Sequence, residues 1–306
     1  MSDSRPVAAL DLGTNTFLML IAVRDSAGEL RALEDVWRTP RLGEGLAATG
    51  AISAAAHRRG LESLREFSGR LRELDVDPLR VRAVGTAVLR RASNAAEFVA
   101  AARRESRLEI EVLSEQDEAR LGWLATAARG SARALAIVDV GGGSAQVAAR
   151  GGALRRSIPV GAVVLTERFQ PDSPGAAYSD ETWRELCATA ARASEVIEPE
   201  PGADVVVLGG NGANLACLES RAARFDPAPT EGWRGRAASA AAWAERLRKL
   251  DLAARLALPI EPPRAAILPA GLAVLSAVLA RLDAKDFRVS GLGLRYGVAR
   301  ELLFGT

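Results

Sequence analysis

The sequence is poor in the residues that most metal and redox sites require. Its 306 residues include two cysteines, Cys187 and Cys217, which form no Cys-x-x-Cys pair, and a single histidine, His57. Neither a zinc site nor a disulfide framework is therefore indicated, and a phosphohistidine mechanism that relies on partner histidines is excluded. We expect both thiols to be buried and His57 to lie on the surface of a helix.

Long apolar runs and dense basic runs are also missing. The longest apolar stretch, residues 265–280, is interrupted by Pro269 and is shorter than the ~20 residues that cross a bilayer, so a buried helix explains it better. The N-terminus shows no basic region followed by an apolar stretch and a cleavage site. The formal net charge is only +2, which gives nucleic-acid binding little support. We expect a cytoplasmic protein that binds neither membranes nor nucleic acid.

The length and composition indicate two packed domains. Apolar residues make up 48% and charged residues 25% of the chain, an ordinary balance for a globular protein. Apolar runs at 7–10, 17–23 and 29–36, separated by turn residues, predict an antiparallel meander. Ser53 then caps a predicted helix, and strands alternate with helices as in an α/β domain. Further strands are predicted at 81–84, 110–113, 134–140, 204–208 and 287–290, further helices at 94–104, 114–129, 180–196, 236–249 and 264–282, and a surface loop at 226–235.

Two segments of the chain resemble each other. AALDLGTNTFLMLIA and AIVDVGGGSAQVAA both read as an apolar strand, then Asp-x-Gly-x-x-Thr/Ser, then a second strand. This similarity indicates an internal duplication in which each of two domains carries one glycine-containing hairpin, as in folds that clamp phosphates between two lobes. A break at Arg129-Gly130-Ser131 places the predicted boundary, so that residues 1–130 form the first domain and residues 131–306 the second.

The loops of these two hairpins are typical of phosphate sites. Glycines let backbone N–H groups approach an anion, and hydroxyl side chains add donors. Asp11 and Asp139 end the strands beside these donors, where a carboxylate would repel phosphate unless a cation lay between them. This arrangement predicts a magnesium ion, although an Asp can also simply cap its own turn. The candidate phosphate ligands are Gly13, Thr14, Asn15 and Thr16 in the first loop and Gly141, Gly142, Gly143 and Ser144 in the second.

Three acidic residues, Glu115, Asp117 and Glu118, lie in the first turn of the helix predicted after residue 113. The helix dipole alone favours acidic side chains there, but one of them could be a general base at a strand-to-helix edge, where α/β proteins place ligands. The residue pattern does not choose among the three. Arg90 and Asn94 follow a Val-Gly-Thr-Ala turn, which is another place where an anion could bind.

Six motifs in order resemble the exopolyphosphatase and guanosine pentaphosphatase family. They are DLGTNTFLMLI, RLGEGL, VGTAVLRRASNAAEF, IEVLSEQDEARL, IVDVGGGSAQV and IPVGAVVLTERF, and they span roughly residues 7–169. VVLGGNGANLACL and VSGLGLRYGVA match the C-terminal motifs more loosely. The resemblance implies a short two-domain member with an α/β, actin-like fold of the ribonuclease H type, an active site in the cleft between the lobes, and a homodimer.

The resemblance also implies roles for particular residues. Glu118 matches the catalytic Glu that activates water, Asp139 matches a magnesium-linked Asp, and Arg90 matches an Arg that holds phosphate. Residues 11–16 and 141–144 match the two phosphate loops. The departures from the usual pattern are Gln116 and Asp117 before the catalytic position, and Asn211 and Asn214 in a loop that often carries Thr.

We therefore expect a hydrolase that removes the terminal phosphate of inorganic polyphosphate, guanosine pentaphosphate or both. Magnesium would assist, and water activated by Glu118 would attack the phosphoanhydride. One alternative is an ATP-dependent kinase, because the actin-like fold also serves sugar and acetate kinases. The other is a sensor that binds polyphosphate or a guanosine alarmone without turnover. The sequence does not choose between polyphosphate and guanosine pentaphosphate.

Overall fold

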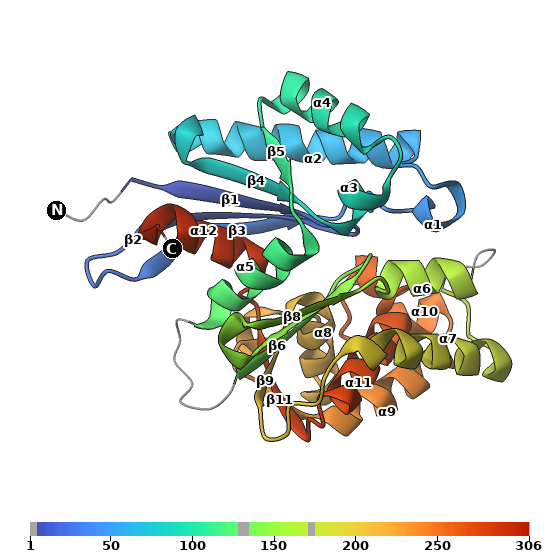
Figure 1. Cartoon of the computed structure of the whole chain (residues 1–306). Coiled ribbons are helices and arrows are strands. Elements are labelled where there is room, and N and C mark those ends of the chain that lie inside the picture. The colour runs from blue at the N-terminus through green and yellow to red at the C-terminus, as the bar shows by residue number, and fades with distance from the viewer. Residues whose placement is uncertain (1–4, 128–134, 171–174, 306) are drawn as a thin grey trace. The chain divides into compact units, whose positions relative to one another are not determined.

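The computed structural model describes residues 5–127, 135–170 and 175–305, and the chain forms two compact units (Figure 1). One unit combines residues 1–128 with residues 294–306, and the other consists of residues 129–293. The boundary predicted between residues 130 and 131 lies outside the described residues. The C-terminal end of the chain was expected in the second domain. Its last helix, α12 (Leu294–Phe304), instead belongs to the first unit.

The first unit is built on a five-stranded sheet with the strand order β3-β2-β1-β4-β5. The first three strands are antiparallel neighbours, and β4 and β5 run parallel to β1. The antiparallel meander predicted from the apolar runs is thus confirmed. The strands are β1 (Val7–Leu12), β2 (Phe17–Arg24), β3 (Leu30–Arg38), β4 (Val81–Gly85) and β5 (Ile110–Val112).

Helices cover both faces of this sheet. They are α1 (Leu46–Thr49), α2 (Ala54–Glu73), α3 (Ala87–Arg91), α4 (Ala95–Ser106) and α5 (Glu115–Ala127), together with α12. Because side chains alternate along a strand, β1 contributes to two cores: Leu10 packs in one cluster with Phe67 of α2. Ala9 packs in the other with Leu121 of α5 and Val298 of α12. Figure 1 shows α2 and α4 on the face opposite α5 and α12.

The position of α12 depends on contacts between residues far apart in the chain. A Cβ atom at Gly297 would lie 2.0 Å from the carbonyl oxygen of Leu121, so only glycine allows α12 to lie this close to α5. Near the other end of α12, the carboxylate of Glu301 pairs with Arg82 at 2.6 Å and also with Arg120. These contacts explain why the helix joins the first unit rather than the second.

Two serines begin helices as predicted. The Ser53 hydroxyl accepts a hydrogen bond from the Ala56 amide at 3.2 Å at the start of α2. The Ser114 hydroxyl accepts from the Asp117 amide at 3.1 Å and donates to the Asp117 carboxylate at 2.7 Å. Both caps satisfy amides that the first helical turn leaves without a partner.

The second unit repeats the topology of the first with one additional strand. Its sheet has the order β10-β11-β9-β6-β7-β8, in which β6, β7 and β8 form an antiparallel meander and β9 and β11 continue parallel to β6. The strands are β6 (Leu135–Val140), β7 (Ala145–Ala149), β8 (Leu154–Ile158), β9 (Asp204–Leu208), β10 (Arg234–Arg236) and β11 (Asp286–Ser290). The shared order of the two meanders is what a duplicated domain would show.

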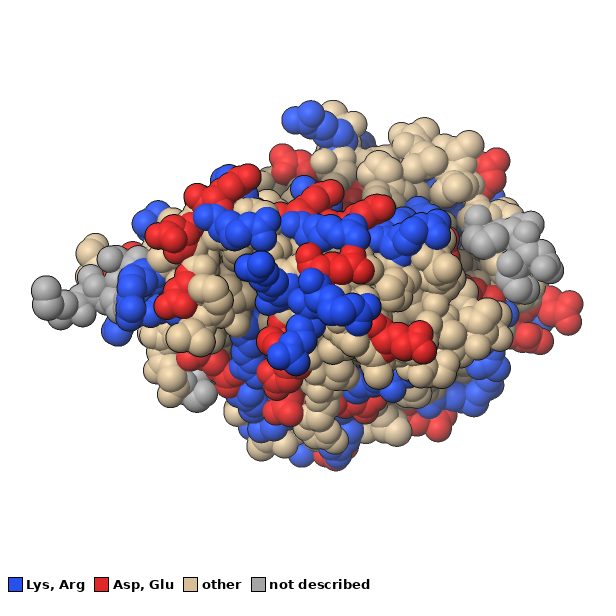
Figure 2. All heavy atoms as spheres, turned by 90° about the horizontal axis from the view of Figure 1, so that it is seen from above, with Lys and Arg blue, Asp and Glu red and all other residues tan. Residues whose placement is uncertain are grey.

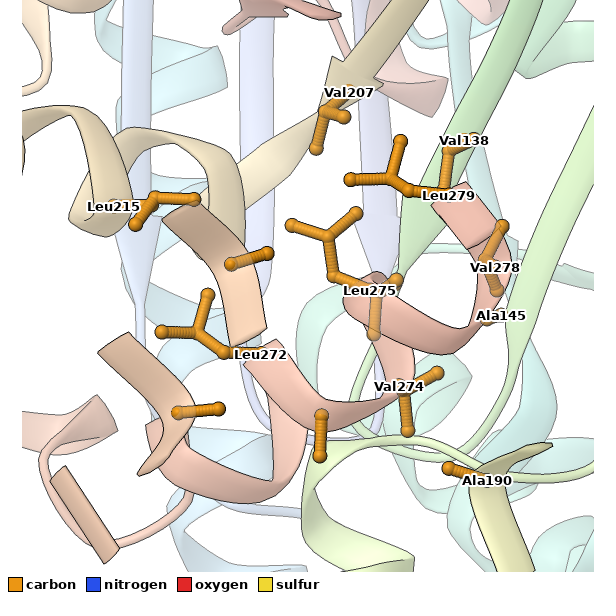
Figure 3. Close-up of a cluster of buried hydrophobic side chains, with 14 of the residues drawn as sticks. Val138, Ala145, Ala190, Val207, Leu215, Leu272, Val274, Leu275, Val278 and Leu279 are labelled. Carbon is orange, nitrogen blue, oxygen red and sulfur yellow. The ribbon is translucent and has the colours of Figure 1, made fainter. Parts of the chain in front are cut away.

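The core of the second unit is centred on α11 (Leu268–Arg281), the apolar stretch predicted to be a buried helix. Figure 3 shows Leu275 and Leu279 of this helix beside Val138 of β6 and Val207 of β9. Within the part of the chain that the structure describes, no helix combines the length and apolarity that crossing a membrane would require. The other helices are α6 (Ala162–Phe169), α7 (Asp180–Ala193), α8 (Gly209–Glu219), α9 (Ala237–Arg248) and α10 (Leu252–Leu256), and 3₁₀ turns occur at Pro78–Arg80, Arg150–Gly152, Ser194–Val196, Ala228–Thr230 and Pro262–Arg264.

One predicted loop is wrong, and another is partly structured. Asn211 and Asn214 lie in α8 rather than in a loop, because their side chains are buried and form the hydrogen bonds described below. The expected loop at 226–235 contains a 3₁₀ turn, and its last two residues belong to β10, which pairs with β11.

Two predictions about burial also need correction. The imidazole of His57 is half-buried rather than on the surface, because its ring packs edge-on against the ring of Phe98, with 5.3 Å between centroids. Cys217 is buried as predicted, whereas Cys187 is only half-buried.

Acidic and basic side chains are interleaved over the face of the first unit that carries α2 and α4 (Figure 2). Arg65 of α2 pairs with Glu105 of α4, and Arg38 of β3 pairs with Glu66 of α2. A surface on which opposite charges alternate offers no extended field to a polyanion.

Candidate functional site

The two glycine-containing hairpins have the same geometry. In the first, the Gly13 amide donates to the Thr16 carbonyl oxygen at 3.1 Å, and in the second the Gly141 amide donates to the Ser144 carbonyl oxygen at 2.9 Å. The strand register agrees as well, since each aspartate, Asp11 or Asp139, pairs with the residue seven positions later in the chain. A glycine turn by itself is unspecific, but the same loop and register in both units support a common origin.

The first loop is held by a glycine from the RLGEGL motif. The Gly43 amide donates to the Thr14 carbonyl oxygen at 2.8 Å, and the Arg41 amide donates to the Asn15 carbonyl oxygen at 3.0 Å. A Cβ atom at Gly43 would lie 2.3 Å from the Thr14 side chain. The side chains of Thr14 and Asn15 are buried, and Thr16 is partly exposed. The loop is thus rigid, and Thr16 is its most accessible hydroxyl.

The second loop is held in a similar way by the start of α6. The amides of Ala162 and Val163 donate to the carbonyl oxygens of Gly141 and Gly142 at 3.0 and 2.9 Å. A Cβ atom at Gly161 would lie 2.5 Å from the Gly142 carbonyl oxygen. Gly143 and Ser144 are buried, and the Ser144 hydroxyl accepts a hydrogen bond from the Gln146 amide group at 2.7 Å.

Asp139, the penultimate residue of β6, lies beside the beginning of α8. It pairs with Leu208 of β9, and the residue after Leu208, Gly209, adopts a φ of 75° at the first position of the helix. A Cβ atom at Gly209 would lie 3.4 Å from the Asp139 carboxylate oxygen Oδ1. Because the amino end of a helix carries partial positive charge, this position favours an ionised carboxylate and any anion next to it.

Arg264 is a cation at the start of α8 that the sequence did not reveal. Its guanidinium lies against Gly210, where an added Cβ atom would be 2.2 Å from the central guanidinium carbon. The Glu261 carboxylate holds the guanidinium at 2.8 Å. The first two residues of α8 therefore contact an aspartate, at Gly209, and a guanidinium, at Gly210.

Asn211 and Asn214 support the second loop and the start of α8. The Asn211 side chain donates to the Val140 carbonyl oxygen at 2.6 Å, directly before the loop glycines. The Asn214 side chain donates to the Gly210 carbonyl oxygen and accepts from the Glu261 amide, both at 2.8 Å. Both side chains are buried, and these bonds assign them a structural role.

Arg90 and Glu118 form an ion pair in the first unit, with 2.7 Å between Nη2 and Oε2. The two side chains are only 17% and 13% exposed, and Arg90 also donates to the Leu113 carbonyl oxygen at 2.9 Å. The Thr86 amide, at the start of α3, donates to the Leu12 carbonyl oxygen at 3.3 Å. The pair therefore lies where β1, β4 and β5 end, at the same edge of the sheet as the first loop.

The three acidic residues at the start of α5 have different environments. Glu115 is exposed, whereas Asp117 is held by Ser114 and by Arg120 at 3.5 Å. The hydrogen bond from Ser114 lowers the pKa of Asp117 below its ordinary value, although burial acts in the opposite direction. Glu118 is the one of the three that pairs with Arg90. Packing thus separates residues that the sequence pattern left equivalent.

Asn94 does not act as an anion ligand here. Its side chain accepts from the Ile52 amide at 2.8 Å and donates to the Ile52 carbonyl oxygen at 3.0 Å. This bidentate contact ties the chain before α2 to the start of α4.

No group of three or more His, Cys, Asp or Glu side chains suited to a metal ion occurs within the described residues. Each hairpin instead contributes a single aspartate. Magnesium is commonly bound through one or two carboxylates, with water and phosphate oxygens as its remaining ligands. The donor set therefore fits magnesium that arrives with a phosphorylated substrate better than a closed metal site built from protein alone.

Comparison with known proteins places these features in a family. A family model described as the Ppx/GppA phosphatase family matches residues 21–304. A solved member of the Ppx/GppA family from Aquifex aeolicus is 28% identical, with 99% of this chain and 99% of that chain covered and a TM-score of 0.78. An exopolyphosphatase-like protein is 25% identical, with 97% of this chain and 98% of that chain covered and a TM-score of 0.88.

A further likeness concerns the fold alone. An exopolyphosphatase from Cytophaga hutchinsonii is 21% identical, with 99% of both chains covered and a TM-score of 0.84. Together with the matching topologies of the two units, these whole-chain likenesses confirm the predicted α/β, two-domain actin-like fold of the ribonuclease H type.

Proposed function

This chain belongs to the Ppx/GppA phosphatase family, and we propose that it hydrolyses the terminal phosphoanhydride of inorganic polyphosphate or guanosine pentaphosphate. The observation that carries the proposal is the Arg90–Glu118 ion pair beside the first hairpin loop. It combines a cation that can hold a phosphate oxygen with a carboxylate that can accept a proton from water. Both are held on a rigid edge where three strands end.

Glu118 acts in this proposal as the general base. A neighbouring guanidinium stabilises a carboxylate as an anion and makes it a weaker base. When Arg90 binds a phosphate oxygen, its charge is shared with the substrate, and Glu118 can accept a hydrogen bond from the attacking water. Substrate binding would thus activate the base at the moment when it is needed.

The two hairpin loops bind phosphate in this proposal through backbone amides and hydroxyls. The residues are Gly13, Thr14, Asn15 and Thr16 in the first loop, and Gly141, Gly142, Gly143 and Ser144 in the second. Asp139 and Asp11 would hold magnesium, which would neutralise the charge that develops on the phosphate oxygens. The position of Asp139 at the amino end of α8 supports its role, since the helix favours phosphate at the same place.

The decisive experiment measures phosphate release from short polyphosphate, long polyphosphate and guanosine pentaphosphate, with and without magnesium. No phosphate acceptor other than water is added, so turnover also excludes a kinase. We expect magnesium-dependent release from at least one substrate. Glu118→Gln should lower kcat by about a hundredfold or more. Glu115→Gln is the matched control, because it makes the same change at an exposed position three residues away.

Two results would overturn the proposal. Turnover of Glu118→Gln at the parent rate would remove the assigned base. Binding of all three substrates without any product would indicate a sensor instead of an enzyme.

We also propose that the protein works in the cytoplasm as a homodimer, which the family resemblance of its motifs supports. One chain has a mass of 32.2 kDa. Light scattering of the purified protein should give twice that mass, and a mass that stays at the monomer value at micromolar concentration would contradict the dimer.

A further inference from the structure

An ion pair with a buried guanidinium joins the C-terminal helix to the edge strand of the first unit. Arg295 of α12 donates from Nε and Nη2 to the two carboxylate oxygens of Asp35 in β3, both at 2.7 Å. The Tyr296 hydroxyl donates to Asp35 Oδ2 at 3.0 Å. Arg295 is only 9% exposed, whereas the Asp35 side chain is 30% exposed, so a buried guanidinium holds a partly exposed carboxylate at the edge of the sheet.

The pair lies on the same face of the sheet as Asp11. Asp35 is opposite Leu20, and Leu20 is opposite Ala9, whose side chain packs under α12. Asp11 is two residues beyond Ala9 in β1, so its side chain points to the same face. The Arg295 guanidinium therefore lies over the face that carries both carboxylates.

The charge of Arg295 is distributed unequally between the two aspartates. Burial lowers the pKa of Arg295, but the hydrogen bonds with Asp35 and the charges of Asp35, Tyr296 and Asp11 outweigh it and raise the pKa overall. Asp35 has the larger share because it has the bidentate hydrogen bonds, and Asp11 interacts through its charge. A carboxylate that receives both bonds of a guanidinium has less charge and fewer lone pairs to offer a metal ion.

Anchoring α12 is not a sufficient explanation for this pair. The helix is already held by its apolar face and, near its other end, by Glu301 with Arg82 and Arg120. Moving the Arg295 guanidinium out of water is costly, and its ion pair is therefore weak evidence for a purely stabilising role.

We propose that Asp35 is a positioning residue for the first hairpin: by holding Arg295, it limits the share of the guanidinium that Asp11 receives and so preserves Asp11 as a ligand for a divalent cation. This inference rests on the proposed role of Asp11 in the phosphate site. The C-terminal helix thereby contributes to a cation site formed near the other end of the chain.

The test replaces Asp35 by Asn, which keeps its size and removes its charge. The Arg295 guanidinium is then free to interact more strongly with Asp11. Binding of Mn²⁺ should therefore weaken by about tenfold. Electron paramagnetic resonance of the free ion, with orthophosphate present, measures this binding. The magnesium concentration for half-maximal phosphate release should rise by a similar factor. Adding Arg295→Gln to Asp35→Asn should restore Mn²⁺ binding, because it removes the competing cation.

Glu301→Gln is the control, because it weakens the other anchor of α12 away from Asp11. It should lower the unfolding temperature and leave Mn²⁺ binding unchanged. Three results would overturn the inference: Mn²⁺ binding by Asp35→Asn at the parent affinity, a double variant that binds no better than Asp35→Asn, or no measurable Mn²⁺ binding by the parent.

The Mn²⁺ measurement separates this inference from the proposed function. A protein that releases no phosphate but shows the loss and the rescue of Mn²⁺ binding would retain the inference and refute the hydrolase. Normal phosphate release with Mn²⁺ binding that is insensitive to Asp35→Asn would support the hydrolase and refute the inference.

Discussion

Gly161 lies against the backbone of Gly142, close enough that a Cβ atom would be 2.5 Å from the Gly142 carbonyl oxygen and 2.7 Å from that of Gly141. The contact comes from the turn before α6 and holds the second hairpin loop in place. Backbone atoms cannot move aside as the end of a flexible side chain can. The glycine is therefore required by its neighbours and not by its own backbone conformation.

Gly161→Ala should consequently displace the second loop. We expect a loss of about 1–3 kcal/mol in the free energy of unfolding, measured by urea denaturation, together with slower phosphate release. Gly69→Ala is the matched control, since Gly69 lies in α2 and an added Cβ atom would meet nothing closer than 4.0 Å. That variant should be as stable as the parent or more stable. Equal stabilities of the two variants would contradict the steric argument.

Arg90→Gln should reduce the stabilisation of the transition state and so lower kcat/KM, without unfolding the protein. The guanidinium is expected to hold a phosphate oxygen, and loss of a charged hydrogen bond of this kind costs about 10–100-fold in kcat/KM. Steady-state phosphate release measures the effect. Arg91→Gln provides the comparison, because Arg91 is the exposed neighbour in α3. An unchanged kcat/KM for Arg90→Gln would show that Arg90 neither holds the phosphate nor orients Glu118 for catalysis.

Asp139→Asn should increase the requirement for magnesium. The substitution preserves the volume of the side chain at the start of α8 and removes the charge that would bind the cation. The magnesium concentration for half-maximal activity should rise about 10–100-fold. Asp286→Asn changes an exposed residue at the amino end of β11. It should leave the magnesium requirement unchanged. The assignment fails if both variants titrate with magnesium as the parent does.

Glu245 makes stability depend on pH in the acidic range. Its hydrogen bonds with Arg248, and then with Lys249, lower the pKa of this carboxyl from 4.5 to about 2 against a smaller effect of burial. Because the folded pKa is the lower one, the stabilisation is fully present above pH 4.5 and is lost as the pH falls toward 2. The carboxylate is 44% exposed, so solvent limits the effect to about 1 kcal/mol or less.

Urea denaturation at pH 7 and pH 3 measures this effect. The parent should lose more stability between the two pH values than Glu245→Gln does, and added salt should reduce the difference. Glu185→Gln, at an exposed position in α7, should behave like the parent. An equal loss for all three proteins would show that the pair contributes nothing.

Much of the local structure followed from the sequence. The apolar runs predicted β1, β2 and β9, and Ser53 and Ser114 predicted the starts of two helices, because the apolar pattern of a strand and the cap of a helix depend on residues close together in the chain. Likewise the spacing of Asp and Gly in the two hairpins predicted loops that are equivalent in hydrogen bonding and register. These features are decided within about twenty residues.

The tertiary structure decided which side chains work together. Glu115, Asp117 and Glu118 share one helical turn, and only packing pairs Glu118 with Arg90. Asn211 and Asn214 read as loop residues because their partners lie far away in the chain.

Arg295 meets Asp35 across 260 positions of sequence, and α12 returns to the first unit because Gly297 fits against α5. The preference of a segment for a strand, a turn or a helix start is set by its own residues. A contact between distant residues forms only once the chain between them has folded.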